Sequence, residues 1–139
     1  MFWNEKEENI SEEELLSLQL RRLAGAVERA GRSSYYGNLF AGKGLKGKKI
    51  KNLDDIRDFP FTTKDDLRES YPSGMLATSM DDIVRMHASS GTTGKSTLVF
   101  HTGRDISNWA NIVARGLYAV GVRKSDIFRV AGLFNAAAK

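Results

Sequence analysis

The sequence predicts an α/β fold in which a helical first part precedes the start of a mixed or parallel sheet with a crossover helix. Up to about residue 80, apolar residues recur at helical spacing or fall in short local segments. Runs typical of strands begin only at Ile83. From there the order is strand, polar loop, strand, helix and strand, which is how an α/β sheet begins.

The clearest helix is expected over residues 11 to 30. Ser11 can cap this helix, acidic residues follow at the positive end of its dipole, and Gly31 stops it. Its apolar residues form one stripe, which predicts a packing helix: Leu16, Leu20, Leu23, Val27 and Ala30.

Shorter helical segments are expected in the rest of the first part. Residues 34–40 read as a helical turn and residues 52–56 as a short helix that ends before Phe59-Pro60. Residues 62–70 begin with a capping threonine followed by acidic residues, which predicts another helix. Residues 71–74 then form a turn.

The second part is expected to supply the sheet. Residues 83–88 and 97–102 are rich in β-branched and aromatic side chains and read as strands. Residues 103–121 carry apolar groups at helical steps, with Trp109 expected in the core. Residues 126–131 read as a further strand.

A loop of glycines and hydroxyl residues joins the first two of these strands. Glycines allow close approach of the backbone, hydroxyls donate hydrogen bonds, and a lysine adds a point charge. Successive backbone N–H groups turned inward form a concavity that suits a phosphate. The candidate binding residues are Ser89, Ser90, Gly91, Thr92, Thr93, Gly94 and Lys95.

A Walker A loop of a P-loop NTPase is the obvious alternative for this segment. Gly94-Lys95-Ser96 has the right ending, but Ser89 stands where that motif needs its first glycine. A Walker A lysine also begins a helix whose N-terminus holds the phosphate. Here residues 97–100 are poor helix formers and good strand formers, so this alternative is disfavoured.

Composition narrows the remaining classes. The 139 residues are 41% hydrophobic and 27% charged, contain no cysteine and carry a net charge of +4, which is ordinary for one globular domain in a reducing cytoplasm. No apolar run approaches membrane-spanning length, and no spacing of histidines and acids suggests a metal site. A lysine cluster lacks interleaved aromatic residues and favours a solvated loop over nucleic-acid binding: Lys43, Lys46, Lys48, Lys49 and Lys51.

The loop and its flanks resemble one known family. Residues 86–97 resemble the phosphate-binding signature of the adenylate-forming superfamily, and most closely that of the phenylacetate–coenzyme A ligases. Residues 60–68 with Tyr71-Pro72 resemble the segment that precedes this signature, and residues 105–126 resemble the one that follows it. The similarity extends from about Leu15 to Phe134.

The resemblance implies a two-step ligase. ATP and an aryl acid would give an acyl-adenylate and pyrophosphate, and coenzyme A would then take the acyl group. By this similarity Ser90, Thr92, Thr93 and Lys95, with the amides of Gly91 and Gly94, would hold the β- and γ-phosphates. ATP, Mg²⁺, an aryl carboxylic acid and coenzyme A are therefore the expected ligands, with neither nucleic acid nor membrane as a partner.

The resemblance also implies that the chain is an incomplete N-terminal domain, part of the large N-terminal domain of an adenylate-forming enzyme. Residues 1–80 would be its helical segment, residues 81–134 its strand, loop, strand, helix and strand, and residues 135–139 a divergent tail. Ser96 replaces the proline usual in the family. The family's acidic motifs and adenylation lysine lie further along, so the catalytic residues are unknown and activity of this chain alone is not expected.

A different class of function is left open. The chain could be a non-catalytic nucleotide- or phosphate-binding module that pairs with separately encoded ligase parts. An unpaired edge of the sheet would then mediate self-association or binding to those parts.

Overall fold

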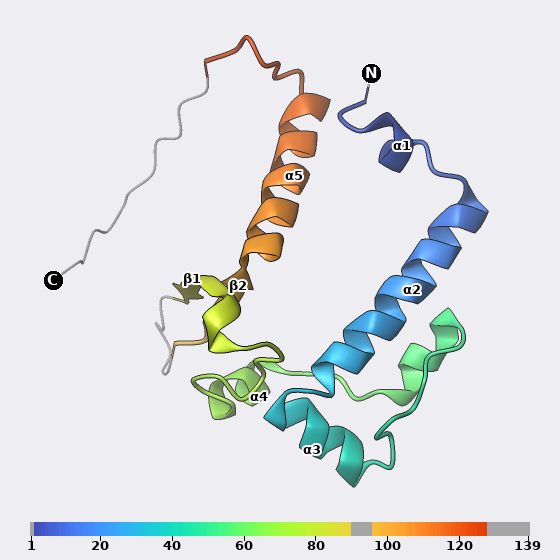
Figure 1. Cartoon of the computed structure of the whole chain (residues 1–139), viewed down its shortest axis with the longest axis vertical. Coiled ribbons are helices and arrows are strands. Elements are labelled where there is room, and N and C mark those ends of the chain that lie inside the picture. The colour runs from blue at the N-terminus through green and yellow to red at the C-terminus, as the bar shows by residue number, and fades with distance from the viewer. Residues whose placement is uncertain (1, 90–95, 128–139) are drawn as a thin grey trace, which may run out of the picture.

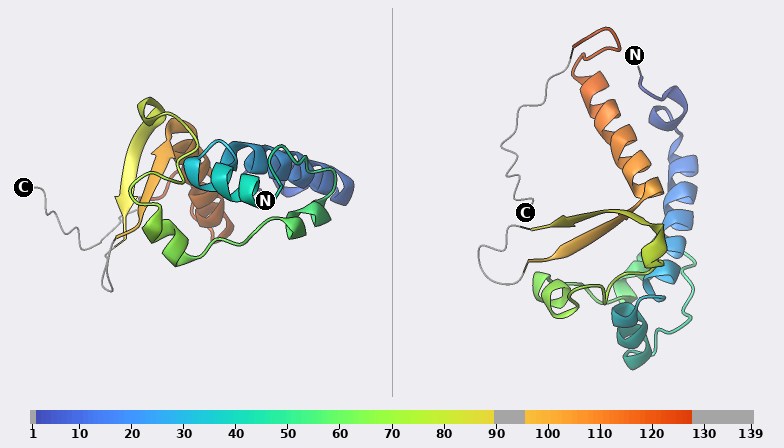
Figure 2. Two further views of the ribbon diagram at one scale, coloured as in Figure 1. Left: turned by 90° about the horizontal axis from the view of Figure 1, so that it is seen from below. Right: turned by 60° about the vertical axis from the view of Figure 1, so that its left-hand side comes forward.

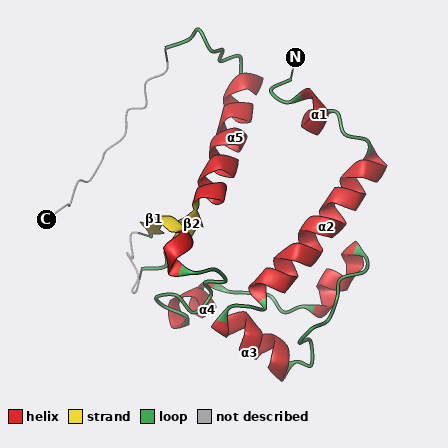
Figure 3. Ribbon diagram, viewed as in Figure 1, coloured by secondary structure: helices red, strands yellow, loops and turns green. Residues whose placement is uncertain are grey.

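The computed structural model describes residues 2–89 and 96–127. The helical first part and the later strands are arranged around two long helices, α2 and α5, as Figure 1 shows. In the described residues the strands form one hairpin, and helices make up most of the remaining regular structure (Figure 3). The predicted α/β class, with helices first and strands from Ile83, is confirmed.

Helix α2 spans Glu12–Ala30 and begins as the sequence predicts. The Ser11 hydroxyl accepts from the Glu14 amide at 3.2 Å, and the Glu14 carboxylate accepts from the Ser11 amide at 3.2 Å. This reciprocal pair satisfies donors that the first helical turn leaves open. The predicted apolar stripe is half-buried from Leu20 onward, whereas Leu16 is exposed.

Three shorter helices follow: α3 over Ser34–Gly42, the 3₁₀ helix η1 over Leu53–Asp58 and α4 over Lys64–Glu69. The three predicted segments are therefore confirmed. Asn52 with Asp55 and Thr63 with Asp66 repeat the reciprocal cap seen in α2. Since each cap depends only on residues three apart, the sequence alone suffices to place these helices.

An aromatic row holds the helical part together. Phe40 is 7% exposed and meets the edge of Phe59 with ring centroids 5.2 Å apart. Tyr36 lies 5.7 Å from Phe40 and 5.0 Å from Tyr35, so four rings pack in series. Buried Ser33 is satisfied, because its hydroxyl donates to the Ala30 carbonyl at 2.8 Å.

The hairpin pairs β1 (Ile83–Ala88) with β2 (Leu98–Thr102) in antiparallel order, preceded by the 3₁₀ helix η2 over Met80–Asp82. Met86 pairs with Phe100, His87 with Val99 and Ala88 with Leu98. A bulge lies between Ile83 and Arg85. Both predicted strands are confirmed within one residue, and their alternation gives the hairpin two different faces.

Helix α5 spans Gly103–Ala119 and leaves the end of β2 at a steep angle to the hairpin (Figure 2). Trp109 of α5 contacts rings on one face of the hairpin, whereas Leu98 and Phe100 on the opposite face line a cavity beside the α4 region. The Thr102 hydroxyl and the Asp105 carboxylate cap α5 reciprocally, which couples the end of β2 to the start of the helix. The predicted helix is therefore present, ending two residues early.

The N-terminal segment lies against α5. The Trp3 indole Nε1 donates to the Asn111 side chain at 2.7 Å, and its ring lies 6.0 Å from that of Tyr118. The short helix α1, Glu5–Glu8, follows directly, and Glu8 pairs with Arg115 at 3.7 Å. The first residues of the described chain thus pack against its last helix.

The remaining expectations concern the burial of Trp109 and a strand over residues 126–131. Trp109 is 46% exposed, so its predicted place in the core is wrong; it packs on one side against the hairpin and faces solvent on the other. The predicted strand over residues 126–131 lies mostly outside the described residues, and Asp126 and Ile127 are not in a strand. None of the helices in the described ranges is long and apolar enough to cross a membrane.

Candidate functional site

The base of the predicted phosphate loop is a closed hairpin. Beyond the last strand pair, the Ser89 amide donates to the Thr97 carbonyl at 3.0 Å. The Ser89 hydroxyl accepts from the Thr97 amide at 2.9 Å, and the Thr97 hydroxyl lies 3.1 Å from it. Three hydrogen bonds between two residues therefore fix where the intervening loop begins and ends.

Of the seven predicted binding residues, Ser89 lies within the described part of the chain. The other six, Ser90, Gly91, Thr92, Thr93, Gly94 and Lys95, fall on residues 90–95, outside the described residues. Ser89 stabilises the hairpin base, where its hydroxyl accepts hydrogen bonds from Thr97. The same hydroxyl still has its own O–H group to donate. Contact with phosphate stays a prediction for all seven.

The chain that leaves the loop speaks against the P-loop alternative. Ser96 and Thr97 are not helical, and β2 begins at Leu98 in antiparallel pairing with β1. A Walker A loop needs a helix directly after its lysine, because the helix N-terminus holds the phosphate. Any phosphate bound here would therefore depend on loop amides, hydroxyls and Lys95.

Three rings pack together on the hairpin face that is turned toward α5. The imidazoles of His87 and His101 meet edge to face with centroids 5.0 Å apart. Trp109 lies 5.6 Å from His87 and stacks on His101 at 5.7 Å with an interplanar angle of 30°. Since His87 precedes Ser89 by two residues, this ring cluster joins the hairpin to α5 close to the base of the loop.

Hydrogen bonds to a carboxylate hold the other end of β2. The Thr102 hydroxyl and amide both donate to the Asp105 carboxylate, at 2.7 and 2.9 Å. These hydrogen bonds hold the pKa of Asp105 below its usual value, with smaller contributions from His101 and Arg104. Asp105 therefore remains ionised at neutral pH and anchors the strand-to-helix junction.

The described residues offer no metal site built by the protein itself. Across residues 2–89 and 96–127, no group of three or more His, Cys, Asp or Glu side chains converges as metal ligands. His87 and His101 pack through their ring faces and edges.

Sequence reasoning missed two features of this region. It did not bring His87 and His101 together, although antiparallel pairing with His87 opposite Val99 puts both imidazoles on one face. It also grouped Ser89 with the binding residues without seeing its bonds to Thr97. The hairpin register is the signal that would have found both, because alternate residues of paired strands share a face.

Comparisons with known proteins find relatives that share one name. No family model matches the chain. A phenylacetate–coenzyme A ligase from Escherichia coli K12 is 46% identical over 131 residues, which cover 91% of this chain. The ligase of the same name from Aromatoleum evansii is 45% identical over the same length, and that from Thermus thermophilus is 40% identical over 124 residues.

A solved structure gives the same answer for the fold. The chain is similar to 2-hydroxyisobutyryl-CoA ligase in complex with 2-HIB-AMP and CoA, with a TM-score of 0.77 and 27% identity over 88% of this chain. It spans about 30% of the length of the E. coli and A. evansii relatives and 27% of that solved chain. The similarity therefore covers nearly all of this chain and a minor part of each relative.

Proposed function

We propose that this chain is part of an acid–thiol ligase similar to the phenylacetate–coenzyme A ligases, which match 91% of it, and that its hairpin loop binds the phosphates of ATP. The supporting observation is the hairpin base, where Ser89 and Thr97 join the loop ends by three hydrogen bonds. A loop closed in this way loses less conformational entropy when a ligand orders it.

The proposed chemistry explains the composition of the loop. In the complete ligase, attack of an aryl carboxylate on the α-phosphate of ATP forms an acyl-adenylate and releases pyrophosphate. Negative charge that develops on the leaving phosphates is stabilised by fixed donors. The hydroxyls of Ser90, Thr92 and Thr93, the amides of Gly91 and Gly94, and the Lys95 ammonium would supply those donors. Mg²⁺ would come bound to the triphosphate, and coenzyme A would accept the acyl group in the second step.

Residues below the loop would hold it in place. The His87, His101 and Trp109 rings fix β1 and β2 against α5, while Thr102 and Asp105 fix the far end of β2. In this assignment Ser89 and Thr97 are positioning residues, because their hydroxyls contact each other at the loop base. A cytoplasmic location is part of the proposal, since a chain without cysteine needs no oxidising compartment.

Titration with MgATP tests the loop assignment. Chemical-shift changes in a ¹⁵N-labelled chain should concentrate at the amides of Ser89, Ser96 and Thr97 and of the loop between them. Lys95→Ala should weaken the affinity about tenfold, because it removes one charge-assisted contact. Lys64→Ala removes an exposed lysine from α4 and is the matched control, which should leave the affinity unchanged. Equal affinities for both variants would refute the assignment.

The chain alone is proposed to bind ATP without completing the reaction. It spans about 30% of the length of its ligase relatives, so most of a complete ligase has no counterpart in it. Incubated with ATP, Mg²⁺ and phenylacetate, the chain should release no pyrophosphate above background. Release that Thr92→Ala abolishes would show that these residues suffice for adenylation.

The exposed strands favour a second candidate, a phosphate-binding module that pairs with separate ligase parts. Val84 and Met86 of β1 are 65% and 55% exposed, and the described sheet has two strands, each with an unpaired edge. Unpaired edges are templates for another strand. Sedimentation of the chain as a strict monomer, with and without the remaining parts of a ligase, would rule this candidate out.

A further inference from the structure

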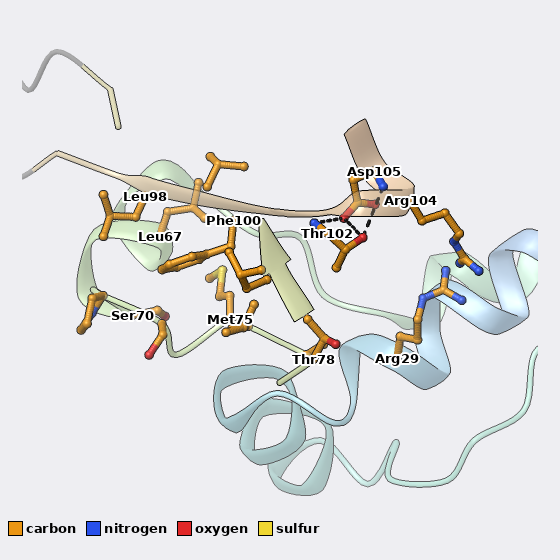
Figure 4. Close-up of a pocket in the computed structure, with 16 residues that line it drawn as sticks. Arg29, Leu67, Ser70, Met75, Thr78, Leu98, Phe100, Thr102, Arg104 and Asp105 are labelled. Atoms are coloured by element: carbon orange, nitrogen blue, oxygen red, sulfur yellow. Dashed lines mark hydrogen bonds between the residues drawn. The ribbon is translucent and has the colours of Figure 1, made fainter. Parts of the chain in front are cut away.

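A cavity of about 530 Å³ lies on the hairpin face opposite α5. The segment from α4 to η2 forms its second wall, and the end of α2 and the start of α5 close one end (Figure 4). The lining residues that the structure describes lie outside residues 89–97, and Leu98 and Val99 directly follow that segment. Its volume falls within the range typical of small-molecule sites.

The walls of this cavity are mostly apolar. They present half-buried side chains and the exposed Leu67, all of which would gain from being covered, and the lining also includes the hydroxyl residues Ser70, Thr78 and Thr102. The apolar lining comes from Leu67, Met75, Leu76, Ile83, Leu98 and Phe100.

Two arginines stand at one end of the cavity. Arg29 lies in the last turn of α2 and Arg104 in the first turn of α5, and both side chains extend toward the same end in Figure 4. None of the ion pairs found in the described residues includes either guanidinium. The nearby carboxylate of Asp105 accepts both of its close hydrogen bonds from Thr102.

This placement of charge favours an added anion, because two guanidinium groups share the space with one carboxylate, that of Asp105. Arg104 lies at the positive end of the α5 dipole, where a cation is disfavoured, and a second guanidinium faces the same space. Paired guanidinium groups bind a carboxylate well, because their donors match its two oxygens.

We propose that this cavity binds an amphiphilic carboxylate, with its head group on Arg29 and Arg104 and its apolar body against Leu98, Phe100 and Met75. The arginines recognise the charge, and the apolar walls recognise the chain or ring attached to it. The residues proposed to hold the carboxylate all lie outside residues 89–97, so the proposal is tested without ATP.

Octanoate is the probe for this site, and NMR titration of the ¹⁵N-labelled chain is the measurement. Octanoate should bind saturably with a Kd on the order of 1 mM. Shifts should fall on the amides of β2 and of residues 73–78. Acetate lacks the apolar body and octanol lacks the charge, so each should bind much more weakly.

Two variants test the arginines. Arg29→Gln with Arg104→Gln should weaken octanoate binding about tenfold. Arg22→Gln, an exposed arginine elsewhere on α2, is the matched control and should leave it unchanged. Both arginines are exposed, so loss of fold is not expected, and far-UV circular dichroism checks it. Saturating MgATP should not alter the octanoate affinity.

The octanoate titrations distinguish a binding site from an uncovered apolar surface. Saturable octanoate binding that the double variant weakens and Arg22→Gln preserves would establish the site. Absence of saturable binding, or equal binding of octanoate and octanol, would overturn the proposal and mark the cavity as a surface for other polypeptide to cover. Equal affinity in the double variant would overturn it as well.

Discussion

The helical part before residue 79 and the hairpin with α5 are built by different rules. The helical part contains both of the described residues that are buried, Ser33 and Phe40, and its helices begin at caps closed within three residues. The described residues of the hairpin and α5 include none that is buried, and Ile112 on α5 is 68% exposed. Local hydrogen bonds and one aromatic row define the first part, whereas strand pairing between distant residues defines the second.

This difference indicates which part of the molecule offers surfaces for binding. The helical part caps its helices with its own side chains and packs four of its aromatic rings in one row. The hairpin and α5 keep apolar side chains, unpaired strand edges and the Arg104 guanidinium available for contact. Surfaces of this kind mark binding sites, and both proposed sites lie at the hairpin.

The largest expected effect comes from the aromatic row. Phe40→Ala removes its central ring and the contacts with Tyr36 and Phe59, so the free energy of unfolding should fall by about 3 kcal/mol. Urea denaturation followed by circular dichroism measures this loss. Phe61→Ala is the matched control, since Phe61 is 96% exposed and its removal should change stability by less than about 0.5 kcal/mol.

Amide hydrogen exchange in the same variant sharpens the comparison. In Phe40→Ala, protection should fall more in α3 than in β1 and β2, because the hairpin takes no part in the aromatic row. An equal loss throughout would mean that the two parts unfold as one unit.

A smaller effect is expected from the ring cluster. Trp109→Ala removes ring contacts with His87 and His101, but half of the side chain already faces solvent, so the expected cost is about 2 kcal/mol. Amide exchange should accelerate in β2 and α5 and stay unchanged in α2. Ile112→Ala, on an exposed side of the same helix, should be close to neutral, and comparable losses in the two variants would argue against the cluster.

The caps should contribute less again. Thr102→Ala should lower stability by about 1 kcal/mol, because α5 loses its cap and β2 loses its link to Asp105. The pKa of Asp105 is lowered in the folded chain, so its contribution is present above the usual pKa of about 3.9 and is lost as the pH falls further. Denaturation at neutral and acidic pH should therefore show wild type and variant converging in acid. A constant difference would exclude Asp105 as the partner.

The smallest expected effect is a change in the pKa of Tyr35. A hydrogen bond to the Asp66 carboxylate, together with burial, raises the pKa of Tyr35 to about 12. Stability from this bond is fully present below the usual pKa of about 10 and is lost as the pH rises toward 12. Asp66→Asn should bring the Tyr35 transition, followed by ultraviolet absorbance, back toward pH 10. An unchanged transition would rule out Asp66 as the cause.

The sequence predicts the helices and strands well because their determinants are local. Ser11 with Glu14 locates the start of α2, and alternating β-branched and aromatic residues locate β1 and β2. Trp109 was misplaced because periodicity shows which face is apolar but not how much protein covers it.

The arrangement of the sites needed the structure. The loop sequence alone identifies a phosphate-binding candidate, but the bonds between Ser89 and Thr97 depend on the hairpin register. The cavity brings Arg29 and Arg104 together from two helices that are far apart in sequence. No local pattern contains that juxtaposition, because it follows from how α2, the hairpin and α5 pack.

The most direct test of the central account, that this chain holds the phosphates of ATP, compares three ligands by calorimetry in the presence of Mg²⁺. Tripolyphosphate should bind about as tightly as ATP, and adenosine should not bind, because the proposed donors all address phosphate. Lys95→Ala should weaken both phosphate ligands about equally. Binding of adenosine comparable to that of ATP, with tripolyphosphate inert, would contradict the account.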